Sequence, residues 1–352
     1  MSGIFGEEQD RVDAMEIYLK KLSSKDPLVA LSNTIQWEIF SADLRTFRKS
    51  LRKYDTGRPP FDPLLMFKIL LLQSLYNLSD ESMEFMIQDR LSFMNFLGLS
   101  SGDRVPDAKT IWFFRNELSK ANMVERLFSR FKEYLASKGL MTHQGQIIDA
   151  SIVESPRQRT TKSEREELAA GKTPANWSAA KSRQKDSDAT WTVRNDRSYF
   201  GYKNHVQADS STKLVSRYSV TTAGVHDSQV FEELLEAPNE GNCATVYADK
   251  AYYSAANEEI LRKHKIKSHV LRRATRGNPL PEDVKAKNVE WSRIRSRVEH
   301  VFGIQYKQIG NLLVRAVGYT RVRASIGLRN LGYNMNRLVF LKKTGVLCFS
   351  GG

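Results

Sequence analysis

The spacing of hydrophobic positions separates a helical first part of the chain from a mixed second part. Up to about residue 140, apolar residues recur at helical spacing in four segments. They include a largely apolar segment at 64–75, which follows the turn-forming sequence GRPPFDP, and an amphipathic segment that ends at Gly139. This part is expected to be an all-α domain, and either a packing role or DNA binding by short helices fits its pattern.

After Gly145 the pattern becomes that of a β-sheet with interspersed helices. QIIDASIVES is rich in β-branched residues and predicts the first strand. The remaining elements are expected in the following order: strands at 203–208 and 213–222, a helix at 228–235, a strand in ATVYADK, a helix in SAANEEILRKH, a strand in KSHVLRR, and helices at 292–308 and 321–342. This order predicts an α/β fold, a ribonuclease H-like mixed sheet whose first three strands form an antiparallel meander. We therefore expect a helical N-terminal domain over 1–140 and a domain built on this ribonuclease H-like sheet over 141–345.

A long polar stretch interrupts this second domain near 156–198. It is rich in Lys, Arg, Ser and Gln and has little hydrophobic periodicity. We interpret it as a flexible insertion.

Charge is distributed unevenly and favours a polyanionic partner. The net charge is +14, and the segment 261–343 carries 20 lysine or arginine residues against four acidic ones. Aromatic residues share this segment, which favours nucleic acid over a merely solvated face or a membrane surface. Two cysteines are too few for a disulfide framework or a cysteine-based zinc site. The acidic N-terminus lacks the apolar run of a signal peptide and no apolar stretch approaches about 20 residues, so we expect no membrane association and a cytoplasmic protein.

Three carboxylates are candidates for metal-dependent phosphodiester chemistry. Such chemistry uses two Mg²⁺ ions held by oxygen ligands from separate elements. Asp149 lies inside an apolar strand, Asp249 ends a strand, and Glu299 is nearly alone among basic residues in a helix. Each has a plainer interpretation as an outward-facing strand residue, a helix cap or a surface ion pair, respectively. Their order along the predicted elements favours a shared metal site.

Other polar residues near these strands are weaker candidates. Asp227 and Glu154 are further acidic residues, and Asp227 follows His226. His205 and His226 are more simply explained as hydrogen-bonded polar groups than as metal ligands. Motifs of zinc proteases, P-loop nucleotidases, dinucleotide-binding folds and serine hydrolases are absent from the sequence.

Seven segments of the chain resemble DDE transposases of bacterial insertion sequences, most closely the insertion-sequence-five family. In order along the chain they are GRPPFDPLLMFKILLLQSLYNLSDESMEFMIQDRLSFMNFLGL, VPDAKTIWFFRNEL, IIDASIVESP, YFGYKNHVQAD, TTAGVHDSQV, VYADKAYYS and RSRVEHVFG. The resemblance implies an N-terminal helical domain and a ribonuclease H-like catalytic domain. It assigns the catalytic and metal-binding acidic positions to Asp149, Asp249 and Glu299, and implies Mg²⁺ as cofactor, as two ions with Mn²⁺ as an alternative.

Around the glutamate the family pattern is Tyr-x2-Arg-x3-Glu-x6-Lys, and this chain matches it in part. Arg295 and Glu299 fit, whereas Ser292 stands at the tyrosine position and Tyr306 at the lysine position, with Lys307 one residue later. These departures leave the acidic triad unaffected. We expect DNA phosphates to be bound by Arg295 and Lys307 together with their basic neighbours Arg293 and Arg297.

The resemblance implies a transposase that cleaves DNA at terminal inverted repeats and joins the 3′ ends to target DNA. Its partner is double-stranded DNA, which the helical domain is expected to bind at the element ends. A homodimer is expected in the DNA complex, since two ends are brought together, and bacterial nucleoid DNA is the expected location. Two alternatives remain: a catalytically inactive sequence-specific DNA-binding relative, and a ribonuclease H-like nuclease without strand transfer.

Overall fold

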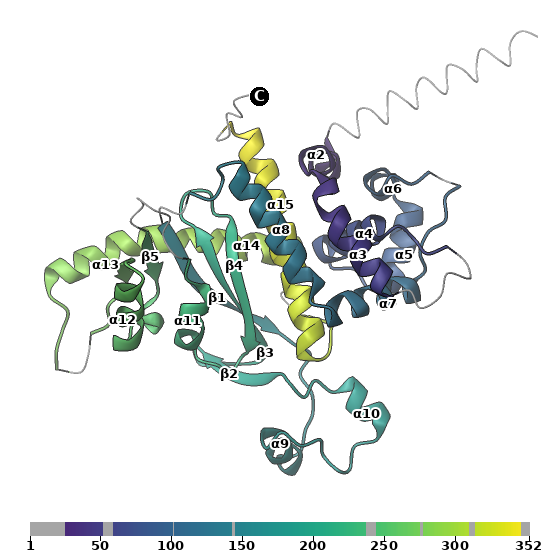
Figure 1. Cartoon of the computed structure of the whole chain (residues 1–352). Helices are drawn as coiled ribbons and strands as arrows, with labels where there is room; N and C mark the ends of the chain where they lie inside the picture. The colour runs from purple at the N-terminus through teal and green to yellow at the C-terminus, as the bar shows by residue number, and fades with distance from the viewer. Residues whose placement is uncertain are drawn as a thin grey trace, which may run out of the picture. The chain divides into compact units, whose positions relative to one another are not determined.

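The computed structural model describes residues 25–51, 59–100, 102–142, 145–236, 244–274, 277–309 and 314–345 (Figure 1). These residues form two compact units. The helical unit comprises the described residues of Met1–Gln73, Leu78–Phe114 and Leu338–Gly352, and the catalytic unit comprises those of Ser74–Asn77 and Arg115–Arg337. Within the described residues, no helix combines the length and hydrophobicity needed to span a bilayer.

The helical unit is built from short helices around an apolar central helix. Its elements are α2 (Pro27–Thr34), η1 (Trp37–Phe40), α3 (Ser41–Leu51), α4 (Pro63–Tyr76), α5 (Asp80–Asp89), α6 (Leu91–Leu97) and α7 (Ala108–Lys120), of which α4 and α7 extend into the second unit. Helix α4 is apolar on all sides, and its residues Phe67, Ile69 and Leu71 are fully buried. Burial of these side chains stabilises this unit through the hydrophobic effect.

Short polar side chains fix where two of these helices begin. Leu65 N donates to Asp62 Oδ2 at 2.9 Å at the start of α4, and Ser82 N donates to Ser79 Oγ at 3.0 Å in α5. Each bond satisfies a backbone N–H that has no partner inside its own helix.

The catalytic unit contains a six-stranded mixed sheet, which confirms the predicted ribonuclease H-like fold. The strands are β1 (Gly145–Glu154), β2 (Thr190–Arg194), β3 (Arg197–Asp209), β4 (Val215–Thr222), β5 (Thr245–Ala248) and β6 (Lys267–Val270). Strands β1, β3 and β4 pair antiparallel as a meander, and β5 and β6 continue the sheet parallel to β1. Strand β2 is an addition to the predicted set and pairs with the first part of β3.

Helices cover both faces of this sheet. The remaining elements are α8 (Met123–Ser137), α9 (Lys162–Ala169), α10 (Ala179–Gln184), η2 (Asp227–Val230), α11 (Phe231–Leu234), η3 (Lys250–Tyr252), α12 (Ala255–Lys263), α13 (Glu282–Arg295), η4 (Ser296–Val298), α14 (Glu299–Ile309) and α15 (Tyr319–Lys343). Phe231 of α11, Tyr252 of η3 and Leu261 of α12 pack on β1 and β5 in one apolar cluster. Val322 and Ile326 of α15 pack with β3 and β4 in another cluster.

Helix α15 is held to the sheet by polar contacts as well as by apolar ones. Asn330 and Asn204 exchange two side-chain hydrogen bonds of 3.0 Å. Asn334 accepts from Val215 N and donates to Val215 O. These buried amides pair completely, so they fix the position of α15 without leaving an unsatisfied group.

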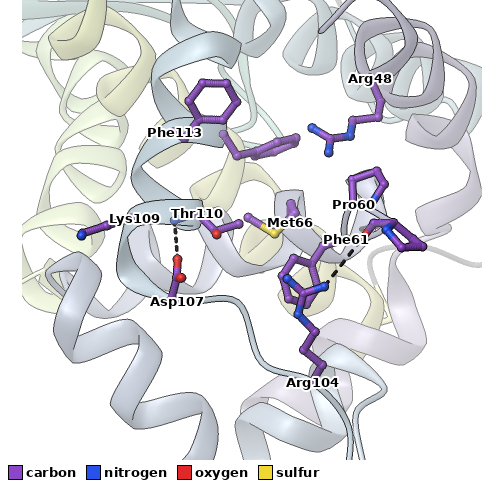
Figure 2. A pocket seen from close by; sticks show the side chains of 11 residues that line it. Arg48, Pro60, Phe61, Met66, Arg104, Asp107, Lys109, Thr110 and Phe113 are labelled. Atoms are coloured by element: carbon purple, nitrogen blue, oxygen red, sulfur yellow. Dashed lines mark hydrogen bonds between the residues drawn. The ribbon is translucent and has the colours of Figure 1, made fainter. Parts of the chain in front are cut away.

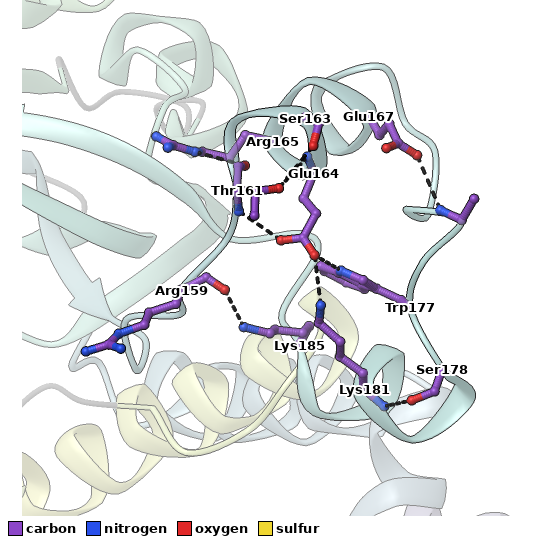
Figure 3. A network of polar contacts seen from close by, with 11 residues as sticks. Arg159, Thr161, Ser163, Glu164, Arg165, Glu167, Trp177, Ser178, Lys181 and Lys185 are labelled. Carbon is purple, nitrogen blue, oxygen red and sulfur yellow. Dashed lines mark hydrogen bonds and ion pairs between the residues drawn. The ribbon is translucent and has the colours of Figure 1, made fainter.

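The predicted insertion near 156–198 contains ordered elements, namely α9, α10 and β2. Glu164 connects the two helices, because its carboxylate accepts from Trp177 Nε1 at 2.7 Å and from Lys181 Nζ at 2.8 Å (Figure 3). It also accepts from the backbone N–H of Thr161, whose hydroxyl caps α9 in return. Strand β2 then joins β3 through Asn195 and Asp196, both at positive φ, as in a tight hairpin.

Two further observations differ from the sequence pattern. The single helix predicted over 292–308 is interrupted by η4, which separates α13 from α14. Helix α8 belongs to the catalytic unit, where Phe128 meets Tyr218 of β4 edge-to-face at 4.8 Å between ring centroids. The division between the units thus follows Phe114, whereas the change from helices to strands occurs near residue 140.

Candidate active site

Two of the predicted carboxylates lie at neighbouring positions on a pair of parallel strands. In the register of β1 and β5, Ile148 lies opposite Ala248, so the next residue of each segment is an aspartate: Asp149 within β1 and Asp249 directly after β5. Asp249 caps η3, and its Oδ1 accepts from Lys250 N at 2.7 Å. The two carboxylates repel each other enough to contribute to the raised pKa of Asp149, whose largest cause is burial.

Arg295, at the end of α13, connects Asp149 to Glu299. Its Nη1 donates to Asp149 Oδ2 at 2.7 Å, and its Nη2 lies 3.4 Å from Glu299 Oε1. The Asp149 and Arg295 side chains are only 14 % and 18 % exposed, so this ion pair is largely shielded from water. Its charge opposes the effect of burial on the pKa of Asp149.

Glu299 is the first residue of α14, and its side chain is 66 % exposed. Arg295 links it to Asp149, and it shares no ligand position with either aspartate. Among the described residues, no three His, Cys, Asp or Glu side chains are grouped closely enough to hold a metal ion. The structure therefore brings two of the three predicted ligands, Asp149 and Asp249, to adjacent positions. The guanidinium of Arg295 separates the third, Glu299, from Asp149.

The donor set nevertheless suits a divalent cation. Asp149 and Asp249 offer carboxylate oxygens, the ligand type that Mg²⁺ prefers. The Nε atom of Arg295 is buried and has no hydrogen-bond partner, so its environment does not satisfy this guanidinium fully. Asp149 and Asp249 thus offer oxygen ligands for a metal, whereas Glu299 would have to move from its place beyond Arg295 to contribute a third ligand.

An aromatic stack positions α13 beside the sheet. The ring of Trp291 lies parallel to that of His269 on β6, with centroids 4.4 Å apart and 6° between the planes. His269 also meets Tyr247 of β5 edge-to-face at 5.0 Å. Because Arg295 lies four residues after Trp291, about one helical turn, this stack fixes the side of α13 from which Arg295 reaches Asp149.

The two aspartates line a cavity of about 180 Å³. Other charged residues line it as well, and the sequence did not connect them with this site. The polar lining of the cavity includes Asp149, Asp249, Asp227, Lys203 and Arg194. Lys203 Nζ donates to Asp227 Oδ1 and to Val225 O, each at 2.7 Å. Asp227, which the sequence left without a role, thus lines the same cavity as the two predicted metal ligands.

The other weak candidates lie outside this cavity lining. His205 lies on β3 and is fully buried, with its Nε2 atom 2.8 Å from Thr221 Oγ1. Burial lowers the pKa of its imidazole to about 4. His226 accepts from Ser228 N and caps η2. Glu154 ends β1. Both histidines are therefore hydrogen-bonded polar groups, as the plainer interpretation had it.

Three of the four predicted phosphate-binding residues have described side chains, and they lie on α13 and η4. Arg293 is exposed, and Arg297 is exposed and donates to Ser210 O at 2.9 Å. Arg295 is the ion-pair partner described above. The side chain of Lys307 lies outside the described residues.

Comparison with known proteins connects both parts of the chain to transposases. A family model described as "Transposase domain (DUF772)" matches residues 16–117, and one described as "Transposase DDE domain" matches residues 141–335, more than half of the chain.

Two solved structures are similar to this chain at low identity. The piggyBac transposase synaptic complex with hairpin DNA is 13 % identical over 91 % of this chain and 76 % of that one, with a TM-score of 0.47. The pre-cleavage Mos1 transpososome is 12 % identical over 76 % of this chain and 84 % of that one, with a TM-score of 0.19. The strand order and the family match, rather than these similarities, identify the fold. The chain belongs to the transposase DDE domain family, and it is a DDE transposase of an insertion-sequence type.

Proposed function

We propose that this protein cleaves DNA at the terminal inverted repeats of its element and transfers the freed 3′ ends into target DNA. We assign the element to the insertion-sequence-five family, on the segments quoted above. One observation carries the chemical part of this proposal. Asp149 and Asp249 are adjacent across parallel strands, and Arg295 joins Asp149 to Glu299.

In this proposal Asp149, Asp249 and Glu299 are the catalytic residues and hold two Mg²⁺ ions, for which Mn²⁺ can substitute. When bound, the ions activate the attacking oxygen and stabilise the leaving oxygen of the phosphodiester. The carboxylates supply the negative charge that retains the ions. The ordered β1 and β5 backbones fix Asp149 and Asp249 before DNA arrives, which reduces the reorganisation that the reaction requires.

Basic residues around the carboxylates would bind and orient the DNA strand. Arg293 and Arg297 are exposed on consecutive turns, so they are placed to contact successive phosphates. Arg295 and Lys307 are assigned to phosphates near the cleavage point. The proposed partners are inverted-repeat and target DNA, bound by a homodimer in the bacterial nucleoid, and the helical unit is proposed to bind the element ends.

Cleavage by an Asp149→Asn variant tests this assignment. The substitution keeps the side-chain shape and removes the charge, so Mg²⁺-dependent cleavage of a labelled duplex carrying the element ends should fall by more than about 100-fold. Asp283→Asn is the matched control, because Asp283 is an exposed carboxylate in the first turn of α13. Its activity should equal that of the wild type.

The products separate the proposal from its alternatives. Strand-transfer products that require Mg²⁺ and Asp149 support a transposase, whereas nicks without joining indicate a nuclease. DNA binding with no metal-dependent product indicates an inactive relative. Full activity of Asp149→Asn would show that the site has been assigned to the wrong residue.

A further inference from the structure

The helical unit contains a larger cavity, of about 380 Å³, outside the candidate active site. It lies between the segment Pro59–Phe61 and helix α7, and Met66 of α4 contributes to its lining (Figure 2). These segments belong to the two N-terminal sequences quoted above, GRPPFDP and VPDAKTIWFFRNEL. The cavity volume is within the range that accommodates small organic groups.

One part of the cavity wall is aromatic. Phe114 is 3 % exposed and packs edge-to-face on Phe47, with ring centroids 5.8 Å apart, so it is a fixed part of the wall. The neighbouring Phe113 is 49 % exposed and also lines the cavity. A half-exposed aromatic ring beside a cavity offers a flat apolar surface to a ligand with a flat face.

Another part of the wall is cationic. Figure 2 shows Arg48 and Arg104 reaching toward the cavity from different segments, while Lys109 points away from both at its margin. The guanidinium of Arg104 lies over the ring of Phe61, 4.1 Å from its centroid, and Nη1 is 3.5 Å from Pro59 O. This stacking keeps the charged group at the cavity and in a defined plane.

The cavity lining has one acidic residue, Asp107, which interacts with Arg104 and Lys109 and offsets only part of the positive charge. Asp107 Oδ1 accepts from Thr110 N at 2.6 Å, so its carboxylate caps the start of α7. Hydrogen bonds with Thr110 are the main cause of its lowered pKa. The cavity therefore combines flat apolar surfaces with an excess of positive charge, which suits a ligand that has both an aromatic ring and an anionic group.

We propose that this cavity binds a single unstacked nucleotide of DNA, with its base against Phe113 and its phosphate against Arg48 and Arg104. Base faces inside a duplex are covered by their neighbours, so only an unstacked base can present a face to Phe113. The proposal rests on the proposed function only in taking DNA as the partner. It does not depend on cleavage or on a bound metal.

A duplex with one extrahelical base tests the proposal. The probe is a 30-base-pair DNA with a single unpaired 2-aminopurine nucleotide, compared with the same DNA fully paired. The wild-type protein should bind the unpaired probe about 5-fold to 100-fold more tightly. Phe113→Ala should remove this preference and leave the affinity for paired DNA unchanged. Arg104→Ala should weaken binding of the unpaired probe as well.

Trp112→Ala is the matched control. Trp112 precedes Phe113 on α7 and is 46 % exposed, but it does not line the cavity. The control should retain the preference for the unpaired probe, and so should Asp149→Asn, which separates this proposal from the catalytic one. Equal affinity of the wild type for the two probes would overturn the proposal. So would an equal loss of preference for the unpaired probe in Phe113→Ala and Trp112→Ala. Equal weakening of both probes by Phe113→Ala would also overturn it.

Discussion

Arg295 contributes the positive charge on which the buried Asp149 carboxylate depends. Arginine stays protonated at any pH at which the protein is folded, so Asp149 retains an ionic partner while no metal is bound. Ser296–Val298 form a 3₁₀ turn directly after Arg295, and Glu299 follows on the next helix. This local geometry lets a single guanidinium contact acidic groups of a strand and of a helix.

Replacing Arg295 tests how strongly this pairing supports the fold. Arg295→Gln should lower the free energy of unfolding in EDTA by about 3–5 kcal/mol, because it leaves a buried carboxylate without its partner. Arg293→Gln removes an exposed charge on the same helix and should change it by less than about 0.5 kcal/mol. Urea denaturation measures both. Equal effects of the two substitutions would mean that the Asp149–Arg295 pair contributes little to stability.

Glu164 gives the insertion a pH-dependent stability. Its hydrogen bond to Lys181 is the largest cause that lowers its pKa from 4.5 to about 2, followed by the bonds from Thr161 and Trp177. Since the folded-state pKa lies below the unfolded one, this contribution is complete above about pH 4.5 and is lost as the pH falls toward about 2.

Hydrogen exchange of the 161–185 segment measures this effect against pH. Wild-type protein should be better protected than Glu164→Gln above pH 4.5, and the difference should shrink as the pH falls toward about 2. Glu166→Gln, an exposed change on the same helix, should follow the wild type. If the difference in protection between wild type and Glu164→Gln did not change with pH, Glu164 would act through its shape and not through its charge.

Helix α15 packs closely at Gly327, where its neighbours leave no room for a side chain. A Cβ atom there would lie 2.6 Å from Val124 Cγ1 of α8 and would also overlap the hydroxyl of Tyr218 on β4. Gly327→Ala should therefore destabilise the catalytic unit by about 1–3 kcal/mol, reduced by the higher helix propensity of alanine.

Gly303 on α14 is the matched control, because a Cβ atom there would meet nothing within 4 Å. Gly303→Ala should raise the melting temperature through helix propensity alone, whereas Gly327→Ala should lower it. If both substitutions raised the melting temperature, α8 and β4 could move away from α15 with no loss of stability, and the close packing at Gly327 would not matter.

Elements specified by local sequence could be predicted, and those that depend on distant contacts could not. The apolar run that predicted β1 and the Ser79 side chain that caps α5 are both local signals. The order of α9 and α10 depends on Glu164 meeting Trp177 and Lys181, residues 13 and 17 positions away. A polar composition therefore concealed an ordered insertion. Strand β2 had a local signal that went unused, the Asn195-Asp196 pair of its hairpin.

The same distinction applies to the candidate site. The sequence indicated Asp149 and Asp249 because each carboxylate interrupts or ends an apolar strand. The shared cavity of Lys203 and Asp227 results from packing between β3 and the segment after β4, which sequence spacing does not reveal. Lys203 was the available signal, because it lies in the buried part of β3, where a charge requires a partner.

Across the whole molecule, positive charge is concentrated in the part of the chain that follows β5. Residues 261–343 carry 20 basic and four acidic side chains, whereas the rest of the chain has a slight acidic excess. Release of counterions from DNA is the main driving force for binding to such a surface. Affinity should therefore decrease steeply as salt increases, and each basic residue at the DNA should contribute separately to that slope.

The slope of the logarithm of the binding constant against that of salt concentration tests which residues face the DNA. Replacing both Arg293 and Arg297 by Gln should reduce its magnitude by about 2, because two phosphate contacts are lost. Replacing Lys285 and Lys287 by Gln removes the same charge from the beginning of α13, where these lysines already pair with Glu282 and Asp283. Their slope should stay near the wild-type value. If both double variants reduced the slope equally, general basicity, rather than the segment beside Asp149, would be what attracts the DNA.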